Sequence, residues 1–470
     1  MFIPIRLDRD RPLQRQIYEQ VRDLVLAGRL HAGARMPSSR VLADRLSVSR
    51  ITVLLSYERL IAEGLLETRP ASGTFVSAPR APSGEGGEPA RASAEPAVND
   101  CAAASARVGQ PDAALFPAGR WQKLMRGALD RLGVQVPADH PAGNPALRAA
   151  IAEWLSTSRR LQVAPEQIIV TSGRQQAVHL VAHLTLRPGA RLVVEDPCDP
   201  DASASLASES APPLRVPVDA DGLCVDRLPE GHADLLHVTP EHQRPLGVML
   251  SRGRRMALLG WANRSGATVL EEDCDGELHY GDTALPSLAC LDPDRRVILL
   301  GGFCLSLGAY PGLAYLVLPH RLVAPALAAR RLLDDARPSL EAGALAEFVA
   351  SGEYARHLHR LTRTYAARRE ALLTSLREEF GQTRVWGGHA GLHLAWLPPP
   401  DLGSAAWLAT LAGRCGLEAA ALPAESRPRL PGTPLLLGFG ALSGTLITQR
   451  VARFATTARI NRPETALSAD

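Results

Sequence analysis

The chain is almost without lysine: Lys123 is the only one among 470 residues, against 51 arginines. The simplest explanation is the base composition of the genome, and selection against lysine is the alternative. Whatever the cause, chemistry that needs a lysine amine, such as Schiff-base formation with an aldehyde, is excluded at every position except Lys123.

Long apolar runs and paired cysteines are missing too. No run of about 18 apolar residues is present to span a membrane, and residues 1–4 do not resemble a signal peptide. We therefore expect a soluble cytoplasmic protein with no membrane partner. The seven cysteines are widely spaced and form no CxxC pair, which argues against a disulfide framework and against a structural zinc site.

Hydrophobic residues make up 46% of the chain, which is enough for large cores. The chain is also long enough for more than one domain. Charge is spread unevenly. Residues 1–80 carry 13 arginines and 8 acids, a net of +5, whereas the other 390 residues carry a net of −2. Only the N-terminal piece has the basic excess that suits a polyanion.

Residues 79–107 are rich in Pro, Gly, Ala, Ser and Glu and show no apolar periodicity, which predicts a flexible linker between two folded bodies. The predicted head spans residues 1–78. The predicted body comprises a large domain over residues 108–345 and a small domain over residues 346–470.

The head is predicted to hold three helices and a hairpin. A helix over residues 13–25 follows Pro12, and a strand–turn–strand pattern covers residues 65–76. Ser49 is the expected N-cap of a third helix carrying Val53, Leu54, Tyr57, Leu60 and Ile61. Ser38 is the expected N-cap of the second helix, whose inward-facing residues are Val41, Leu42 and Leu46.

Two helices joined by a tight turn and followed by a glycine-tipped hairpin predict a winged helix-turn-helix, whose second helix enters the major groove of DNA. The start of that helix would contact base edges, while the preceding helix start and the hairpin would contact the backbone. The alternative is a helical interaction module with solvated arginines. The predicted DNA-binding residues are Arg35, Ser38, Ser39, Arg40, Ser49, Arg50, Ile51, Thr52, Arg69, Gly73 and Thr74.

In the body, helical and strand patterns alternate, which predicts an α/β domain with a mostly parallel sheet. The expected strands are residues 167–171, 191–194, 235–238, 267–270 and 297–300. Beyond about residue 345, amphipathic helices and short strands at residues 391–396 and 435–439 predict a smaller α+β domain.

The head closely resembles the GntR family of bacterial regulators over residues 10–77. The resemblance rests on residues 35–43, 48–53, 63–65 and 73–76. Ile51 is a departure, because asparagine is usual there in the family, and operator preference is expected to differ.

The body resembles a fold-type I aminotransferase, and the whole chain resembles the MocR subfamily of regulators. The matching segments are residues 109–117, 141–148, 170–177, 238–243, 299–303 and 391–394. The resemblance implies a multidomain protein with a PLP-transferase-like large domain, a small α+β domain, and a head-to-tail homodimer. It also implies a double-stranded DNA operator and a small-molecule effector.

The family cofactor is pyridoxal 5′-phosphate (PLP). At several positions where the family has residues that contact PLP, this sequence has different residues. The lysine position is Leu305, and the carboxylate for the pyridine nitrogen is Glu272, one methylene longer than the usual aspartate. Cys274 replaces the tyrosine, and Asp199 replaces the aromatic that stacks on the ring. We therefore expect no bound cofactor and no catalytic residue. The vestigial pocket comprises Ser172, Gly173, Arg174, Gln175, Asp199, His242, Glu272, Cys274 and Leu305.

Several alternatives stay open on the sequence. The protein could be a PLP-responsive regulator, or an aminotransferase retaining non-covalent PLP, or its body could be only a scaffold. Glu272 and Asp199 could bind a cationic ligand such as an amine, or could pair with arginines. Cys198, Cys274 and Cys304 could form a thiol or soft-metal sensor, or could only fill space. The neighbouring His357 and His359 are expected to be surface residues, and no metal site is expected there.

Overall fold

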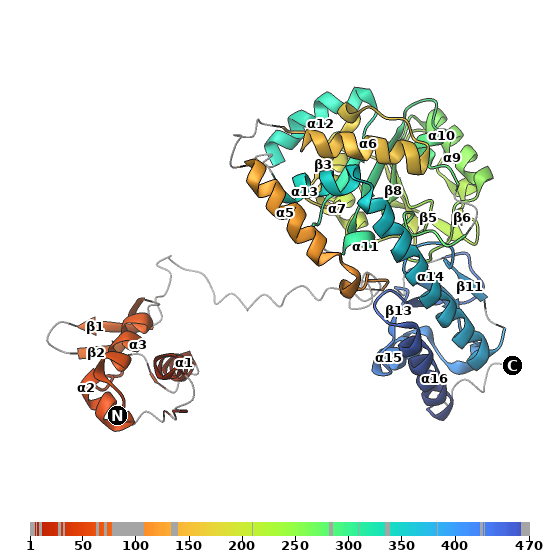
Figure 1. The fold of residues 1–470 in the computed structure, drawn as a ribbon. Coiled ribbons are helices and arrows are strands. Elements are labelled where there is room, and N and C mark those ends of the chain that lie inside the picture. Colours follow the sequence, from red (N-terminus) through yellow and green to blue (C-terminus); the bar gives the residue numbers. More distant parts are fainter. Residues whose placement is uncertain are drawn as a thin grey trace. The chain divides into compact units, whose positions relative to one another are not determined.

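The structure is a computed structural model, drawn in Figure 1. The chain divides into two compact units, Met1–Ala94 and Glu95–Asp470, and each is described by itself. The predicted linker, residues 79–107, lies outside the described residues. The structure describes residues 5–461 except residues 6, 9–11, 27–29, 32, 63–64, 70–72, 78–107, 133–139, 209, 282–284, 309, 334–338, 383, 424–425 and 427.

The head has the predicted elements: α1 (Leu13–Leu26), α2 (Ser39–Leu46), α3 (Arg50–Ala62), β1 (Leu66–Arg69) and β2 (Gly73–Val76). Both predicted helix caps are confirmed. The Ser38 hydroxyl accepts from the Val41 N–H at 3.3 Å, and the Ser49 hydroxyl accepts from the Thr52 N–H at 3.1 Å. Each cap satisfies one backbone donor that the first helical turn leaves without a partner.

The core of the head lies between the three helices and includes Ile17, Leu42, Val53 and Leu60. One inward placement was wrong: Val41 is 48% exposed. Leu54 on the third helix is also exposed, at 43%. Residues next to each other on a helix point about 100° apart. Because Leu42 and Val53 occupy the core-facing positions, their neighbours Val41 and Leu54 turn toward solvent.

The large sheet of the body has eight strands, and its mixed α/β architecture confirms the predicted fold class. The central strands β4, β5, β7, β8 and β9 run parallel, whereas β10 is antiparallel to both of its neighbours. In sheet order the strands are β3 (Ile168–Thr171), β10 (Ala314–Val317), β9 (Val297–Gly302), β8 (Thr268–Asp273), β7 (Leu235–Val238), β4 (Leu192–Asp196), β5 (Leu214–Asp219) and β6 (Gly222–Leu223).

All five predicted strands of this sheet are present, but β5, β6 and β10 were missed. β5 starts exposed and contains Pro217, so it gives no clear strand pattern. The helices that accompany the sheet are α5 (Ala118–Leu132), α6 (Pro145–Arg159), α7 (Arg174–Thr185), α8 (Pro200–Ala207), α9 (Arg252–Ser265), α10 (Leu288–Leu291), α11 (Cys304–Leu307), α12 (His320–Leu333) and α13 (Leu340–Ala350).

The C-terminal part begins with the long helix α14 (Glu353–Phe380), visible in Figure 1 beside α16. Its sheet is antiparallel in the order β11 (Arg384–Trp386), β12 (His393–Leu397), β14 (Leu435–Gly438) and β13 (Glu418–Ala421), with α15 (Ala405–Arg414) and α16 (Gly444–Ile460) packed on it.

The predicted division of the body at residue 346 stays a prediction. Leu345 and Phe348 of α13 belong to the same apolar core as Trp121 of α5 and Leu147 of α6. Helix α13 therefore packs as one piece with the helices that cover the large sheet. Among the described residues, no helix is long and apolar enough to cross a membrane.

Candidate functional site

The first candidate site is the surface formed by the starts of α2 and α3. Arg50 donates from Nε to the Ser39 hydroxyl at 3.3 Å, across eleven residues of sequence. This bond holds the N-termini of the two helices side by side. Ser38, Ser49, Arg40 and Arg50 are all exposed, so the structure brings these predicted residues to one accessible surface.

The hairpin is joined by a segment that the sequence did not predict to pair. Arg35 forms a β-bridge with Phe75, and the Met36 N–H donates to the Thr74 carbonyl at 2.8 Å. The side chain of Arg35 lies over Gly73, where an added Cβ would be 3.5 Å from its Nε. Arg35 therefore belongs to the wing, as we call the hairpin of β1 and β2. Arg69 pairs with Gly73 across the hairpin.

The second candidate site lies in the body, where β8 ends and α7 and α8 begin. Arg174, the first residue of α7, forms a two-point ion pair with Glu272 of β8, in which Nη2 donates to Oε2 at 3.0 Å and Nε donates to Oε1. The same Nη2 lies 3.2 Å from Asp199 Oδ1. His237 Nε2 lies 3.0 Å from Glu272 Oε2. One guanidinium thus serves both acids.

Asp199 has a further role as the N-cap of α8, where its carboxylate accepts from the Ala202 N–H at 3.0 Å. The expected pairing of Glu272 and Asp199 with an arginine is therefore confirmed, and the binding of a cationic ligand stays a prediction. The sequence could not separate the two, because Arg174 and Glu272 lie 98 residues apart.

The electrostatics of this pair are strongly coupled. Burial alone would raise the pKa of Glu272, but the charge of Arg174 and the hydrogen bond from His237 hold that pKa well below its usual value. Burial alone would lower the pKa of Arg174, but Glu272 and Asp199 raise it. Both groups are consequently ionised throughout the physiological pH range.

Leu305, which the sequence resemblance predicts to stand at the position of the family lysine, lies in the short helix α11 (Cys304–Leu307), which follows β9. Its side chain is 6% exposed and belongs to an apolar cluster with Leu358, Leu361 and Tyr365 of α14. It also lines a cavity of about 270 Å³. Leu305 therefore contributes an apolar side chain to the wall of this cavity.

At the start of α7, residues of the predicted vestigial pocket bond within the chain. The Ser172 N–H donates to Gln176 Oε1 at 2.9 Å, and Gln175 Oε1 accepts from the Ser205 hydroxyl at 3.1 Å. Gly173 adopts φ = 150° with no room for a side chain, since a Cβ would lie 3.1 Å from the Gly312 carbonyl oxygen. The close approach explains the glycine.

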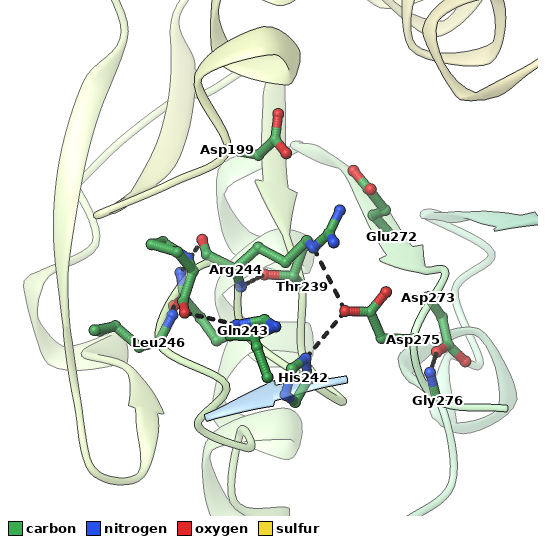
Figure 2. A network of polar contacts seen from close by, with 12 residues as sticks. Asp199, Thr239, His242, Gln243, Arg244, Leu246, Glu272, Asp273, Asp275 and Gly276 are labelled. Carbon is green, nitrogen blue, oxygen red and sulfur yellow. Dashed lines mark hydrogen bonds and ion pairs between the residues drawn. The ribbon is translucent and has the colours of Figure 1, made fainter. Parts of the chain in front are cut away.

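Beside this cluster lies a second polar network, shown in Figure 2. His242 Nδ1 lies 3.0 Å from Asp275 Oδ2, and the Arg244 guanidinium extends toward the same carboxylate at 3.4 Å. The Arg244 N–H donates to the Thr239 hydroxyl at 3.0 Å. The sequence predicted only His242 here. The other three have ordinary polar side chains in loop segments, and only folding brings them together.

The three cysteines do not form one cluster. Cys274 is buried, and its thiol and that of Cys304 share a hydrogen bond that raises the pKa of Cys274. Cys198 instead accepts from Arg215 Nη1 at 3.7 Å. Within the described residues no group of three or more His, Cys, Asp or Glu side chains could hold a metal ion. The soft-metal alternative has no ligand set there, and the thiol alternative stays a prediction.

One expected surface residue is buried. His357 is 2% exposed, and its Nε2 lies 2.8 Å from the Ser306 carbonyl oxygen, whereas His359 is exposed as expected. The two histidines are two residues apart on α14 and so point to different sides of the helix. His357 therefore faces α11 and supports the segment that carries Leu305.

A buried acid in this region predicts a measurable pH dependence. Burial raises the pKa of Glu277 from 4.5 to about 7, although its hydrogen bond from Tyr354 acts in the opposite direction. Because the folded pKa is the higher one, ionising Glu277 destabilises the native state as pH rises from 4.5 through 7. We expect Glu277→Gln to stabilise the body by about 1–3 kcal/mol at pH 8 and by little at pH 5.

Urea unfolding at both pH values, with the exposed Glu378→Gln as control, measures this effect. All six tryptophans lie between residues 121 and 407, so their fluorescence reports on the body alone. An equal change in the free energy of unfolding at pH 5 and pH 8 would contradict the assignment.

Together, a winged helix-turn-helix and an aminotransferase-like body define a DNA-binding regulator built on a PLP-enzyme fold. Residues 13–76 match the family described as "Bacterial regulatory proteins, gntR family", and residues 139–414 match "Aminotransferase class I and II".

Relatives match over nearly the whole chain. The "HTH-type pyridoxine biosynthesis transcriptional regulator PdxR" of Corynebacterium glutamicum is 34% identical over 93% of this chain and 95% of its own. The "Probable rhizopine catabolism regulatory protein MocR" of Rhizobium meliloti is 34% identical over 79% of this chain and 78% of its own. The chain belongs to the GntR family of transcriptional regulators, among those of the MocR type.

The likeness to solved structures concerns the body. A crystal structure of Pyrococcus horikoshii kynurenine aminotransferase superposes with a TM-score of 0.66 at 24% identity, and the match covers 77% of this chain and 90% of that one. At this level of identity the match shows the fold alone. The protein is therefore a DNA-binding transcriptional regulator whose body has the fold of a PLP-dependent aminotransferase.

Proposed function

We propose that this regulator binds its operator through the predicted surface of α2, α3 and the wing, and that its body serves dimerisation and effector sensing without PLP and without catalysis. The observation that carries the proposal is the ion pair of Arg174 with Glu272. The carboxylate that the family reserves for the cofactor's pyridine nitrogen is already taken by a guanidinium.

The other residues at this place fit PLP equally poorly. Leu305 has no amine to form an imine. Asp199 has no aromatic face, and its charge is directed at Arg174 and at the N-terminus of α8. The backbone N–H of Ser172 already donates to the side chain of Gln176. The residues present therefore do not suit the cofactor, and we assign no reaction step to it.

The cavity beside Leu305 is the place that we propose for an effector. Its volume of about 270 Å³ is close to the lower end of small-molecule sites, and its wall is mainly apolar, as in such sites generally. The polar groups of the wall are a few hydroxyls and the carboxylate of Asp112, which already pairs with Arg368 at 2.7 Å. A mostly apolar molecule fits this wall better than an amine. Its lining includes Leu115, Phe116, Leu305, Leu307, Tyr310 and Tyr365.

Titration of the full-length protein with PLP tests the proposal, and the single lysine makes the test unusually clear. We expect no aldimine absorbance, no change in thermal stability that scales with PLP concentration, and no change in operator affinity. Any adduct fixed by borohydride can lie only on Lys123 or the α-amino group, and Lys123→Ala is the control. PLP-dependent stabilisation that survives Lys123→Ala would establish the alternative, a regulator that retains non-covalent PLP.

The dimer and the effector site have tests of their own. Light scattering of the purified protein is expected to give twice the chain mass of 50.3 kDa. A thermal-shift screen of apolar and aromatic metabolites, repeated on Leu305→Trp to fill the cavity, should find compounds whose stabilising effect the substitution removes. Stabilisation that persists in Leu305→Trp would place the effector elsewhere.

A further inference from the structure

Helix α3 carries an exposed apolar stripe. Ile51 is 67% exposed, Leu54 43% and Leu55 42%. Their spacing of three and four residues places them on one face of the helix. This face lies opposite the side on which Val53 and Leu60 enter the core of the head, where both are fully buried. Ile51, Leu54 and Leu55 do not belong to the apolar core of the head.

Charged residues frame the stripe in a way that suits nucleic acid. Arg50 precedes it and Arg40 is exposed at the start of the neighbouring helix, in a head whose residues 1–80 carry a net charge of +5. Glu58 is exposed about one turn beyond Leu54 and Leu55. An acid at that point would repel phosphates, so contact with DNA should end within the first two turns of α3.

We infer that Ile51 and Leu54 determine operator specificity by packing against thymine methyl groups in the major groove. The inference rests on operator binding by the head. Ile and Leu offer no hydrogen-bond donor or acceptor, and the C5 methyl of thymine is the apolar group among the base edges of the major groove. A head that contacts DNA with these side chains selects thymine because its methyl group and the apolar side chains are buried against each other. This selection adds to any hydrogen bonds that Arg50 makes.

A protein partner is the competing occupant of such a stripe. Arg40 and Arg50 at the rim do not by themselves exclude it, since protein interfaces also have polar rims. Duplex DNA matches both the apolar stripe and the arginines beside it, since its phosphates flank the groove in which the methyl groups lie.

The experiment uses the full-length protein and duplexes selected by it from a random library. Each thymine enriched in the selected sequences is replaced by deoxyuridine, one position at a time, which removes only the methyl group. We expect about a fourfold loss of affinity at one or two thymines in each half-site, the effect of exposing about one methyl-sized apolar group. Other enriched thymines should tolerate the replacement.

Variants assign the methyl contacts to residues. In Ile51→Ala, the thymine and deoxyuridine duplexes should bind equally at the position that Ile51 reads, and Leu54→Ala should act likewise at its own position. Ile51→Asn should shift the preference at its position toward adenine, whose edge pairs with an amide. The matched control is Leu332→Ala on α12, which removes an 85% exposed leucine from the body.

The possible failures are distinguishable. If the library yields no enriched sequence, operator binding itself is refuted, and the inference with it. If sequences are enriched but deoxyuridine is harmless at every thymine, only the methyl contacts are refuted. If Ile51→Ala and Leu54→Ala bind all duplexes like the wild type, the stripe is a surface for a protein partner and the inference is wrong.

Discussion

Replacing Arg174 with methionine is expected to lower the free energy of unfolding of the body by about 3–5 kcal/mol. Methionine keeps most of the volume of the side chain but removes its charge. Glu272, whose side chain is 1% exposed, and Asp199, at 9%, would then lie close together without their cation. Urea unfolding followed by tryptophan fluorescence at pH 7 measures the loss.

A double variant separates the loss of charge from the loss of packing. Arg174→Met combined with Glu272→Gln removes one of the stranded charges, and the amide oxygen can still accept from His237. We expect it to recover about half of the stability lost in Arg174→Met. The control Lys123→Ala changes an exposed residue and should stay within about 0.5 kcal/mol of wild type. If the double variant is less stable than Arg174→Met, the buried acids are not the cause.

The pH dependence of Arg174→Met gives an independent check. Without the guanidinium the pKa of Glu272 should rise, because burial then acts unopposed. The variant should therefore regain stability as pH falls from 8 to 5, since a raised carboxyl pKa destabilises the native state only while the group is ionised. A loss of stability that is constant over this range would point to packing instead of charge.

Replacing Arg50 with alanine is expected to weaken operator binding by about 1–3 kcal/mol, or roughly 5- to 150-fold. The bond from Arg50 Nε to Ser39 leaves both terminal nitrogens free to approach a base. This geometry favours two-point donation to guanine O6 and N7. Binding isotherms on the selected operator and on single-base variants measure the effect.

Two further measurements decide what Arg50 contacts. If it reads guanine, Arg50→Ala should lower discrimination at that base pair and leave the salt dependence nearly unchanged. If it contacts phosphate, affinity should fall for all sequences and the salt slope should decrease by about one. Arg15→Ala, an exposed arginine paired with Glu19 on α1, is the charge-matched control. Equal losses in both variants would contradict a specific role for Arg50.

Much of the head was predictable because its determinants are local. Ser38 and Ser49 act on backbone groups three residues away, so the caps could be located from the sequence. The error at Val41 arose because an apolar residue can face a core or a ligand, and sequence pattern alone does not separate the two. The pairing of Arg35 with the wing joins residues 40 apart and gave no local signal.

In the body, the buried parallel strands were predictable because they form continuous apolar runs. Strand β10 was missed, since its four residues become a strand only between β3 and β9. His357 was misplaced for a related reason, because its burial depends on the Ser306 carbonyl, 51 residues away.

The sequence by itself determined that no lysine stands at residue 305, and that the head has the helices and caps of a DNA-binding unit. It left open what the acids Glu272 and Asp199 of the predicted pocket would do. Only the tertiary structure decided that Arg174 reaches Glu272 and Asp199, because residues from three separate elements meet there. The physical reason is the distance along the sequence over which each interaction acts. Caps and apolar periodicity act over a few residues, whereas a buried charge takes whichever partner the completed fold places beside it.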